Sequence, residues 1–243
     1  MNLGLFAGSA FVSAVEEAIK PQPAGLFGFA RPSEESLGRP RLPLDFQQAC
    51  RTAFSALAAR MPNNGVIAVV SPHRGDGRSS VAAGLTGVIA ADTGSQVLLV
   101  ELDFEQPSLA RIFRVSPLPG LADHLEGRSS LRVLSGSGQG VQLITAGGRE
   151  GSVAALLHRS AALGIERAVS STRWVVLDLP PLLDLPEAGV LLSMADAFVL
   201  VGRYRRTLAT SLHRVAKILP ERPTGFFMAA NSSRVPAWLS RLV

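Results

Sequence analysis

The sequence has little of several residue types, and each shortage excludes a class of protein. A single cysteine, Cys50, excludes an intramolecular disulfide and fits a reducing compartment such as the cytosol. No apolar run reaches the ~20 residues that a helix needs to cross a bilayer. The first apolar stretch has no basic segment before it, so we expect no secretory signal.

Charged residues are also scarce, at 18% of the 243 residues, whereas hydrophobic residues reach 47%. This balance excludes global disorder, and the length suffices for one large domain with a substantial core. The 24 Lys and Arg exceed the 19 Asp and Glu, which invites a nucleic-acid interpretation. Yet the basic residues are scattered except in the segment Arg203 to Arg206. We therefore expect a solvated arginine-rich surface and no nucleic acid, with anionic lipid or an acidic partner as the alternative.

What the chain does contain is a glycine loop between an apolar strand and a helix. Residues Gly65 to Ser71 (GVIAVVS) predict a buried strand, PHRGDGRSS follows, and Val81 to Gly94 predict a helix. Gly75 and Gly77 allow the turn that brings backbone N–H groups onto an anion, and the helix N-terminus adds the positive end of its dipole. The arrangement predicts binding of nucleotide phosphates. The candidate binding residues are Gly75, Asp76, Gly77, Arg78, Ser79 and Ser80.

The loop departs from the usual phosphate-binding pattern, G-x-x-x-x-G-K-[ST], at two positions. Pro72 stands in place of the first glycine and Arg78 in place of the lysine, while Ser79 keeps the metal-ligand position. A lysine ammonium is a compact charge that fits between two phosphates, whereas a guanidinium is a wide planar fork. Arg78 is therefore expected to pair with phosphate in a different position. The alternative is a simple glycine turn with a solvated Arg78, and His73 is expected to be an exposed loop histidine.

Three carboxylates follow apolar strands. The strand predicted at Gln96 to Asp103 (QVLLVELD) ends in Glu101 and Asp103, which alternation places on one side, and RWVVLDLPP ends in Asp178. The carboxyl ends of strands are where α/β sheets bind ligands, and carboxylates reach Mg²⁺ directly or through water. The predicted metal ligands are Ser79, Asp103 and Asp178. The predicted catalytic residues are Arg78, Glu101, Asp103 and Asp178.

These motifs resemble those of the cytoplasmic tyrosine kinases of bacterial capsule and exopolysaccharide systems, within the wider MinD/ParA group of P-loop ATPases. The resemblance covers about Phe46 to Asn231 and rests on SPHRGDGRSS, VLLVELDFEQPSLARIF, PGLADHLEG, VQLITAGG and VVLDLPPLLDLPEAGVLLSMADAFVLV. It implies a three-layer α/β/α P-loop fold with a mostly parallel sheet. It also implies ATP or ADP with Mg²⁺ as cofactors, and contact of Asn231 with the adenine base.

The departures from the family pattern concern function. Arg78 replaces the Walker A lysine, Glu101 replaces an aspartate, and the family's oligomer-forming helix keeps only Arg51 of its charged motif. The family phosphorylates a tyrosine cluster near its C-terminus, whereas the sole tyrosine here is Tyr204. We therefore expect kinase activity to be weakened or lost, and no self-phosphorylated tail.

The resemblance further implies a cytoplasmic protein, held at the inner face of the membrane by a membrane-anchored polysaccharide chain-length or export partner. Two alternatives stay open for the helix that carries Arg51. It forms a homo-oligomer by contact with a neighbouring subunit, or it packs on its own sheet. Two other functions stay open: a MinD/ParA-like positioning ATPase and a non-enzymatic interaction module. Against the first, His73 and Arg74 stand where that group carries its additional lysine and glycine.

Four segments are expected along the chain. Residues 1–20 predict a helix that docks on a partner or membrane surface or packs on its own domain, and 21–43 predict a Pro- and Gly-rich linker. Residues 44–231 form the nucleotide-binding domain, and 232–243 a tail. Strands alternating with helices predict a parallel sheet covered on both faces. Further helices are expected at 44–61, 107–113, 121–125, 153–169 and 207–219, and further strands at 131–134, 141–145, 195–201 and 224–230.

Overall fold

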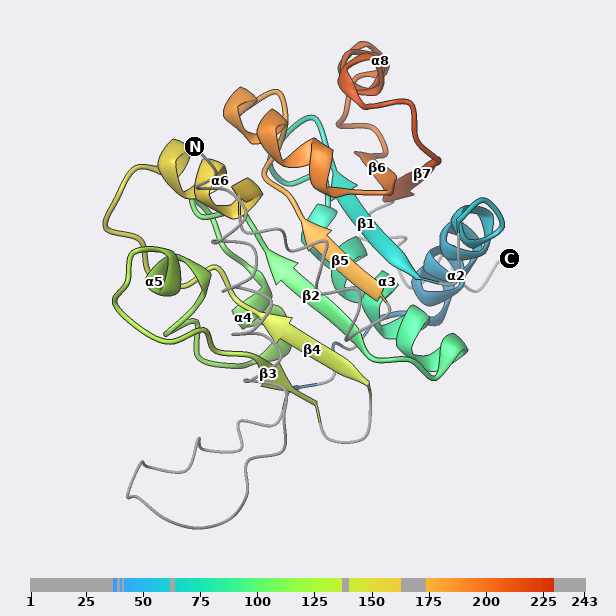
Figure 1. The fold of residues 1–243 in the computed structure, drawn as a ribbon. Coiled ribbons are helices and arrows are strands. Elements are labelled where there is room, and N and C mark those ends of the chain that lie inside the picture. The colour runs from blue at the N-terminus through green and yellow to red at the C-terminus, as the bar shows by residue number, and fades with distance from the viewer. Residues whose placement is uncertain are drawn as a thin grey trace, which may run out of the picture.

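The computed structural model describes residues 37–38, 40, 42–61, 64–136, 140–162 and 174–229. These residues form a seven-stranded sheet of order β3-β4-β2-β5-β1-β6-β7 with helices on both faces (Figure 1). Neighbouring strands are parallel except for the β3–β4 pair. The predicted three-layer α/β fold with a mostly parallel sheet is confirmed. The expected helix at 1–20, most of the linker, Asn231 and the tail at 232–243 lie outside the described residues.

The strands follow the predicted apolar runs, except that β3 shares only Leu134 with the strand expected at 131–134. Their bounds are β1 Gly65–Val70, β2 Val97–Glu101, β3 Leu134–Ser135, β4 Val141–Ile144, β5 Trp174–Asp178, β6 Ala197–Arg203 and β7 Thr224–Ala229. Strands β1, β2 and β5 are buried along their whole length, because helices cover both faces, and such strands appear in sequence as continuous apolar runs. In the register, Asp178 of β5 is opposite both Val69 of β1 and Glu101 of β2, so the carboxyl ends of the three strands are level.

The helices cover the two faces in two groups. Their bounds are α2 Leu44–Ala58, α3 Arg78–Thr93, α4 Leu109–Phe113, α5 Leu121–Leu125, α6 Val153–Ala162, α8 Ala209–Ile218 and the 3₁₀ helix η2 Pro186–Met194. Helices α2, α3 and α4 pack on one face, and α5, α6, η2 and α8 pack on the other. The helix predicted from Val81 already begins at Arg78, because Gly77 is its N-cap. None of the helices in the described part of the chain is long and apolar enough to cross a bilayer.

The PGLADHLEG motif joins helix α5 to the turn that follows β4. Asp123 accepts hydrogen bonds from the backbone N–H groups of Gly120 (2.8 Å) and Gly148 (3.0 Å). A Cβ at Gly120 would lie 2.4 Å from the backbone nitrogen of Gly147, so only glycine fits this approach. Asp123 therefore holds two loops of the sheet edge together.

Helices α2 and α3 lie in close contact because Gly84 of α3 has no side chain. A Cβ at Gly84 would lie 2.7 Å from Phe46 Cε1 and 2.9 Å from Cys50 Sγ of α2. Burial raises the pKa of the Cys50 thiol to about 12. On the outer side, Arg51 of α2 forms a two-bonded ion pair with Asp92 of α3, at 2.7 and 3.0 Å. Arg51, the residue that the resemblance associates with oligomer formation, is thus paired with Asp92 of the same chain.

Gly84→Ala and Gly87→Ala form a matched pair of substitutions within helix α3. A Cβ at Gly87 meets no atom within 4 Å. Alanine there is expected to raise the free energy of unfolding by about 0.5–1 kcal/mol through its higher helix propensity. At Gly84, overpacking against α2 is expected to lower it by about 1–3 kcal/mol. Urea unfolding measures both changes, and equal stability of the two variants would show that α2 does not press on α3 here.

Candidate functional site

The loop between β1 and α3 has the backbone geometry of an anion site. Gly75 (φ 79°) and Gly77 (φ 98°) both adopt left-handed conformations, which glycine tolerates and other residues rarely do. Gly77 is the N-cap of α3, and no side chain in the described part of the chain caps this helix. The first hydrogen bond of the helix runs from the Val81 N–H to the Gly77 carbonyl (3.0 Å). The earlier N–H groups of the first turn are therefore available to a ligand at the positive end of the helix dipole.

A pocket of about 630 Å³ opens over this loop, at the carboxyl edge of the sheet. It is lined by the loop and the start of α3, by the segment after β2, and by the ends of β6 and β7. Four of the lining side chains are arginines: Arg74, Arg78, Arg111 and Arg203. The predicted residues Gly75, Asp76, Gly77, Arg78, Ser79, Ser80 and Asp103 all line it, whereas Glu101 and Asp178 do not. Predicted Asn231 lies outside the described residues.

The Asp76 side chain braces the loop from within. Its carboxylate accepts hydrogen bonds from the His73 N–H (2.9 Å) and from the Thr207 hydroxyl (2.5 Å), and it is buried. Arg203 donates to the Gly75 carbonyl at 3.0 Å. Asp76 thus offers a ligand its backbone and not its carboxylate. Sequence reasoning did not place Thr207 and Arg203 at the loop, and the only signal was the basic cluster that begins at Arg203.

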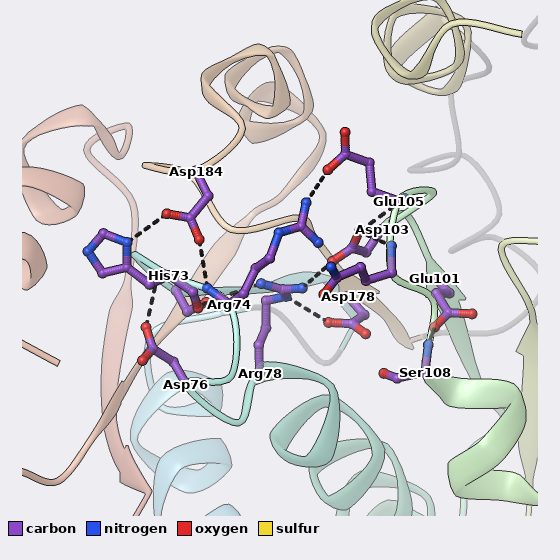
Figure 2. Close-up of polar contacts among 12 residues, drawn as sticks. His73, Arg74, Asp76, Arg78, Glu101, Asp103, Glu105, Ser108, Asp178 and Asp184 are labelled. Carbon is purple, nitrogen blue, oxygen red and sulfur yellow. Dashed lines mark hydrogen bonds and ion pairs between the residues drawn. The ribbon is translucent and has the colours of Figure 1, made fainter. Parts of the chain in front are cut away.

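Asp184, which the sequence did not single out, braces the loop from the other side. It accepts from the Arg74 N–H (2.8 Å) and pairs with His73 Nδ1 (2.7 Å), as Figure 2 shows. His73 Nε2 lies 3.1 Å from the Ser211 hydroxyl. Burial raises the pKa of Asp184, but the hydrogen bonds of His73 and Arg74 outweigh it, so the net pKa is below its ordinary value. The loop histidine is therefore partly exposed but bonded at both ring nitrogens.

Arg78 points into the protein and contacts two of the three predicted carboxylates (Figure 2). Its Nη2 lies 2.8 Å from Asp103 Oδ2, and its Nε lies 3.1 Å from Asp178 Oδ1. Its Nη1 donates to the Ser71 hydroxyl at 3.1 Å. Only 7% of Arg78 is exposed, so the alternative of a solvated arginine is wrong.

Two of the three predicted metal ligands, Asp103 and Asp178, are not free to bind a divalent cation as they are arranged, whereas Ser79 lines the pocket. Asp103 Oδ2 and Asp178 Oδ1 are bonded to Arg78, so a metal ion would have to displace the guanidinium to reach them. No group of three or more His, Cys, Asp or Glu side chains among the described residues is placed to hold a metal. Burial raises the pKa of Asp178, and the positive charge of Arg78 opposes this rise.

Glu101 binds backbone N–H groups beside the pocket. Its Oε1 accepts from the N–H groups of Ser108 and Leu109 at the start of α4, and its Oε2 accepts from that of Ala146 (3.1 Å). Burial and the nearby charge of Asp178 raise its pKa to about 7, although the three N–H donors oppose the rise. Glu101 therefore positions the walls of the site and does not face a ligand in this arrangement.

Comparison with curated proteins finds relatives in polysaccharide systems, although no family model matches the chain. It is 29% identical over 154 residues to a putative tyrosine-protein kinase in the cps region of Klebsiella pneumoniae, covering 62% of this chain and 21% of that protein. It is 30% identical over 148 residues to the succinoglycan biosynthesis transport protein ExoP of Rhizobium meliloti, covering 58% and 19%. For the tyrosine-protein kinase YwqD of Bacillus subtilis the identity is 30% over 139 residues, covering 56% and 58%. The chain is thus similar in sequence to parts of proteins that are named as bacterial tyrosine kinases.

The chain spans about a fifth of the length of the Klebsiella and Rhizobium proteins and over half of the length of the Bacillus protein. Its fold is similar to that of solved bacterial tyrosine kinase domains. The kinase domain of Escherichia coli tyrosine kinase ETK superimposes with a TM-score of 0.67 at 21% identity, covering 86% of this chain and 98% of that one. The septum site-determining protein MinD of Pyrococcus horikoshii, complexed with Mg-ADP, gives a TM-score of 0.59 at 19% identity, covering 73% and 76%. The predicted resemblance to the tyrosine kinases and to MinD is confirmed at the level of the fold.

Glu101 should make the stability of the protein depend on pH. Its folded pKa of about 7 exceeds the ordinary value of 4.5, so the folded state keeps a proton that the unfolded state has lost. The free energy of unfolding therefore falls as the pH rises from 4.5 to about 7, and this contribution is constant outside that window. Glu101→Gln cannot ionise. Urea unfolding at a series of pH values should show the wild type losing stability relative to this variant across the window, and a constant difference would contradict the assignment.

Proposed function

We propose that the chain is a P-loop nucleotide-binding protein of the capsule and exopolysaccharide tyrosine-kinase type, with phosphoryl transfer weakened or lost. The observation that carries this proposal is the position of Arg78. Arg78 occupies the position at which the phosphate-binding pattern has a lysine, and its three nitrogens are bonded to Asp103, Asp178 and Ser71. The proposal predicts a protein that holds ATP or ADP and acts through binding more than through catalysis.

Nucleotide binding is supported by the backbone of the loop. Two left-handed glycines and an uncapped helix start present N–H groups to a pocket of about 630 Å³, a volume typical of small-molecule sites. Arg74, Arg111 and Arg203 add positive charge to the pocket walls. The neighbouring fold of the Mg-ADP complex of MinD supports the same class of ligand.

Weak phosphoryl transfer follows from the way the charges are paired. Transfer of a phosphoryl group requires cations that stabilise the charge of the transition state. Here the Arg78 guanidinium is committed to two buried carboxylates. Removing one partner of such a buried pair costs about 3–5 kcal/mol, because it leaves an uncompensated charge. Arg78 is therefore a poor substitute for a mobile lysine.

The biological role that fits best is regulation of polysaccharide polymerisation or export. The support is relatedness to a cps-region kinase and to a succinoglycan transport protein. In this role the chain acts in the cytoplasm, at the inner face of the membrane, through a membrane-anchored chain-length or export partner. If nucleotide does not bind at all, the same fold serves as an interaction module.

The first test is calorimetric titration of the purified chain with ATP and ADP. We expect micromolar binding to the wild type and little transfer to a Glu/Tyr copolymer. Arg78→Lys should raise nucleotide affinity in Mg²⁺ about tenfold, or about 1.4 kcal/mol, because the lysine releases the carboxylates. Arg60→Lys, an exposed arginine outside the pocket, is the matched control and should change nothing. No binding at millimolar nucleotide, or efficient wild-type transfer, would overturn the proposal.

The second test concerns the role in cells. Deletion of the gene should change the amount or chain length of an exopolysaccharide, measured by gel filtration of the purified polymer. Complementation with the wild-type chain should restore it. Unchanged polysaccharide in the deletion strain would contradict a regulatory role, whatever the nucleotide titration shows.

A further inference from the structure

Arg78 lies between Asp103 and Asp178, two of the three residues that the sequence predicts to bind a divalent cation. We propose that the Arg78 guanidinium takes the place of that cation, so that the site binds its phosphate ligand without Mg²⁺. The inference rests on the proposed function only for the identity of the phosphate ligand. The exclusion of metal stands on the contacts of Arg78 alone.

The guanidinium connects three neighbouring strand ends. Asp103 follows β2, Asp178 ends β5, and Ser71 follows β1, and these strands are adjacent in the sheet. One nitrogen of Arg78 contacts each residue, at 2.8 Å to Asp103 and 3.1 Å to the other two. A planar fork suits this spread of acceptors, whereas a lysine ammonium is a single point.

The carboxylate oxygens at this position are nearly all in use. Asp103 Oδ1 accepts from the N–H groups of Glu105 (3.2 Å) and Gln106 (3.1 Å), and Asp103 Oδ2 and Asp178 Oδ1 accept from Arg78. Within the described residues, Asp178 Oδ2 is the buried carboxylate oxygen without a hydrogen-bond partner. Mg²⁺ is usually bound through one or two carboxylates, with water and ligand phosphates at its other positions. Asp178 is 0% exposed and does not line the pocket, so water and phosphate do not reach this oxygen while Arg78 is in place.

The charges favour the arginine over an incoming metal. The side chains of Arg78, Asp103 and Asp178 are 8%, 4% and 0% exposed. A guanidinium stays positive at any pH at which proteins fold, so displacement by a metal would leave a buried cation without its partners. Conversely, removal of the guanidinium would leave two buried carboxylates without a counter-charge. These carboxylates would then recruit a divalent cation.

The experiment measures binding of Mn²⁺ alone, without nucleotide, from the loss of the free-ion signal in electron paramagnetic resonance. The wild-type chain should bind no Mn²⁺ at this site, and Arg78→Gln should bind about one ion per chain, which Mg²⁺ displaces. Adding Asp178→Asn to Arg78→Gln should abolish the gain. Arg111→Gln is the matched control, because it removes the same charge from the pocket wall. It should bind no Mn²⁺.

Wild-type binding as tight as that of Arg78→Gln, or no binding by a folded Arg78→Gln variant, would overturn the proposal. Folding is checked by a cooperative thermal transition, and Arg78→Met, which keeps an apolar stem, replaces a variant that fails. If neither variant folds, Mn²⁺ binding is compared between the wild type and Asp178→Asn. Binding by the wild type that Asp178→Asn abolishes overturns the proposal, and no Mn²⁺ binding by the wild type supports it.

Titration of the wild type with ADP extends the test to the phosphate ligand. Affinity should be equal within about twofold in Mg²⁺ and in EDTA, and a tenfold gain in Mg²⁺ would overturn the proposal. Absence of ADP binding in both buffers would instead refute the proposed nucleotide function. The Mn²⁺ result would still decide whether Arg78 replaces the metal.

Discussion

A buried guanidinium held between two carboxylates is the interaction on which the geometry of the pocket depends. Arg78 is the first residue of α3, while Asp103 and Asp178 belong to the ends of two strands. Their ion pairs therefore fix the start of the helix against the carboxyl edge of the sheet. Because that helix start also presents the N–H groups of the glycine loop, the same contacts determine where an anion is received.

Much of the fold could be predicted because its strands are buried on both faces. Such strands appear as continuous apolar runs, and Gly65 to Ser71 is an example that the structure places at β1. The start of α3 was predicted three residues late, because Arg78, Ser79 and Ser80 look like a polar loop. A left-handed Gly77 already begins the helix before them. The 3₁₀ conformation of η2 had no counterpart in the apolar periodicity.

The site was harder to predict, because a pattern along the chain assigns a side chain to a face and not to a partner. Alternation placed Glu101 and Asp103 on one side of their strand. Glu101 nevertheless turns to the N–H groups that begin α4, whereas Asp103 turns to Arg78. Asp184 and Thr207 lie more than 100 positions from the loop that they brace, and only the folded sheet brings them there. The sequence shows that Arg78 stands in place of the lysine, but it does not show that the Arg78 side chain points toward Asp103 and Asp178.

The bracing of the loop has a consequence for the outer surface of the molecule. Asp76 is tied to Thr207, and the Gly75 carbonyl is tied to Arg203, so the loop and the segment after β6 form one mechanical unit. Tyr204 lies between these two anchors and is 62% exposed. An exposed tyrosine that other molecules can contact is therefore joined to the phosphate loop through the residues on either side of it. A molecule that binds at Tyr204 would contact the same segment that holds the loop in place.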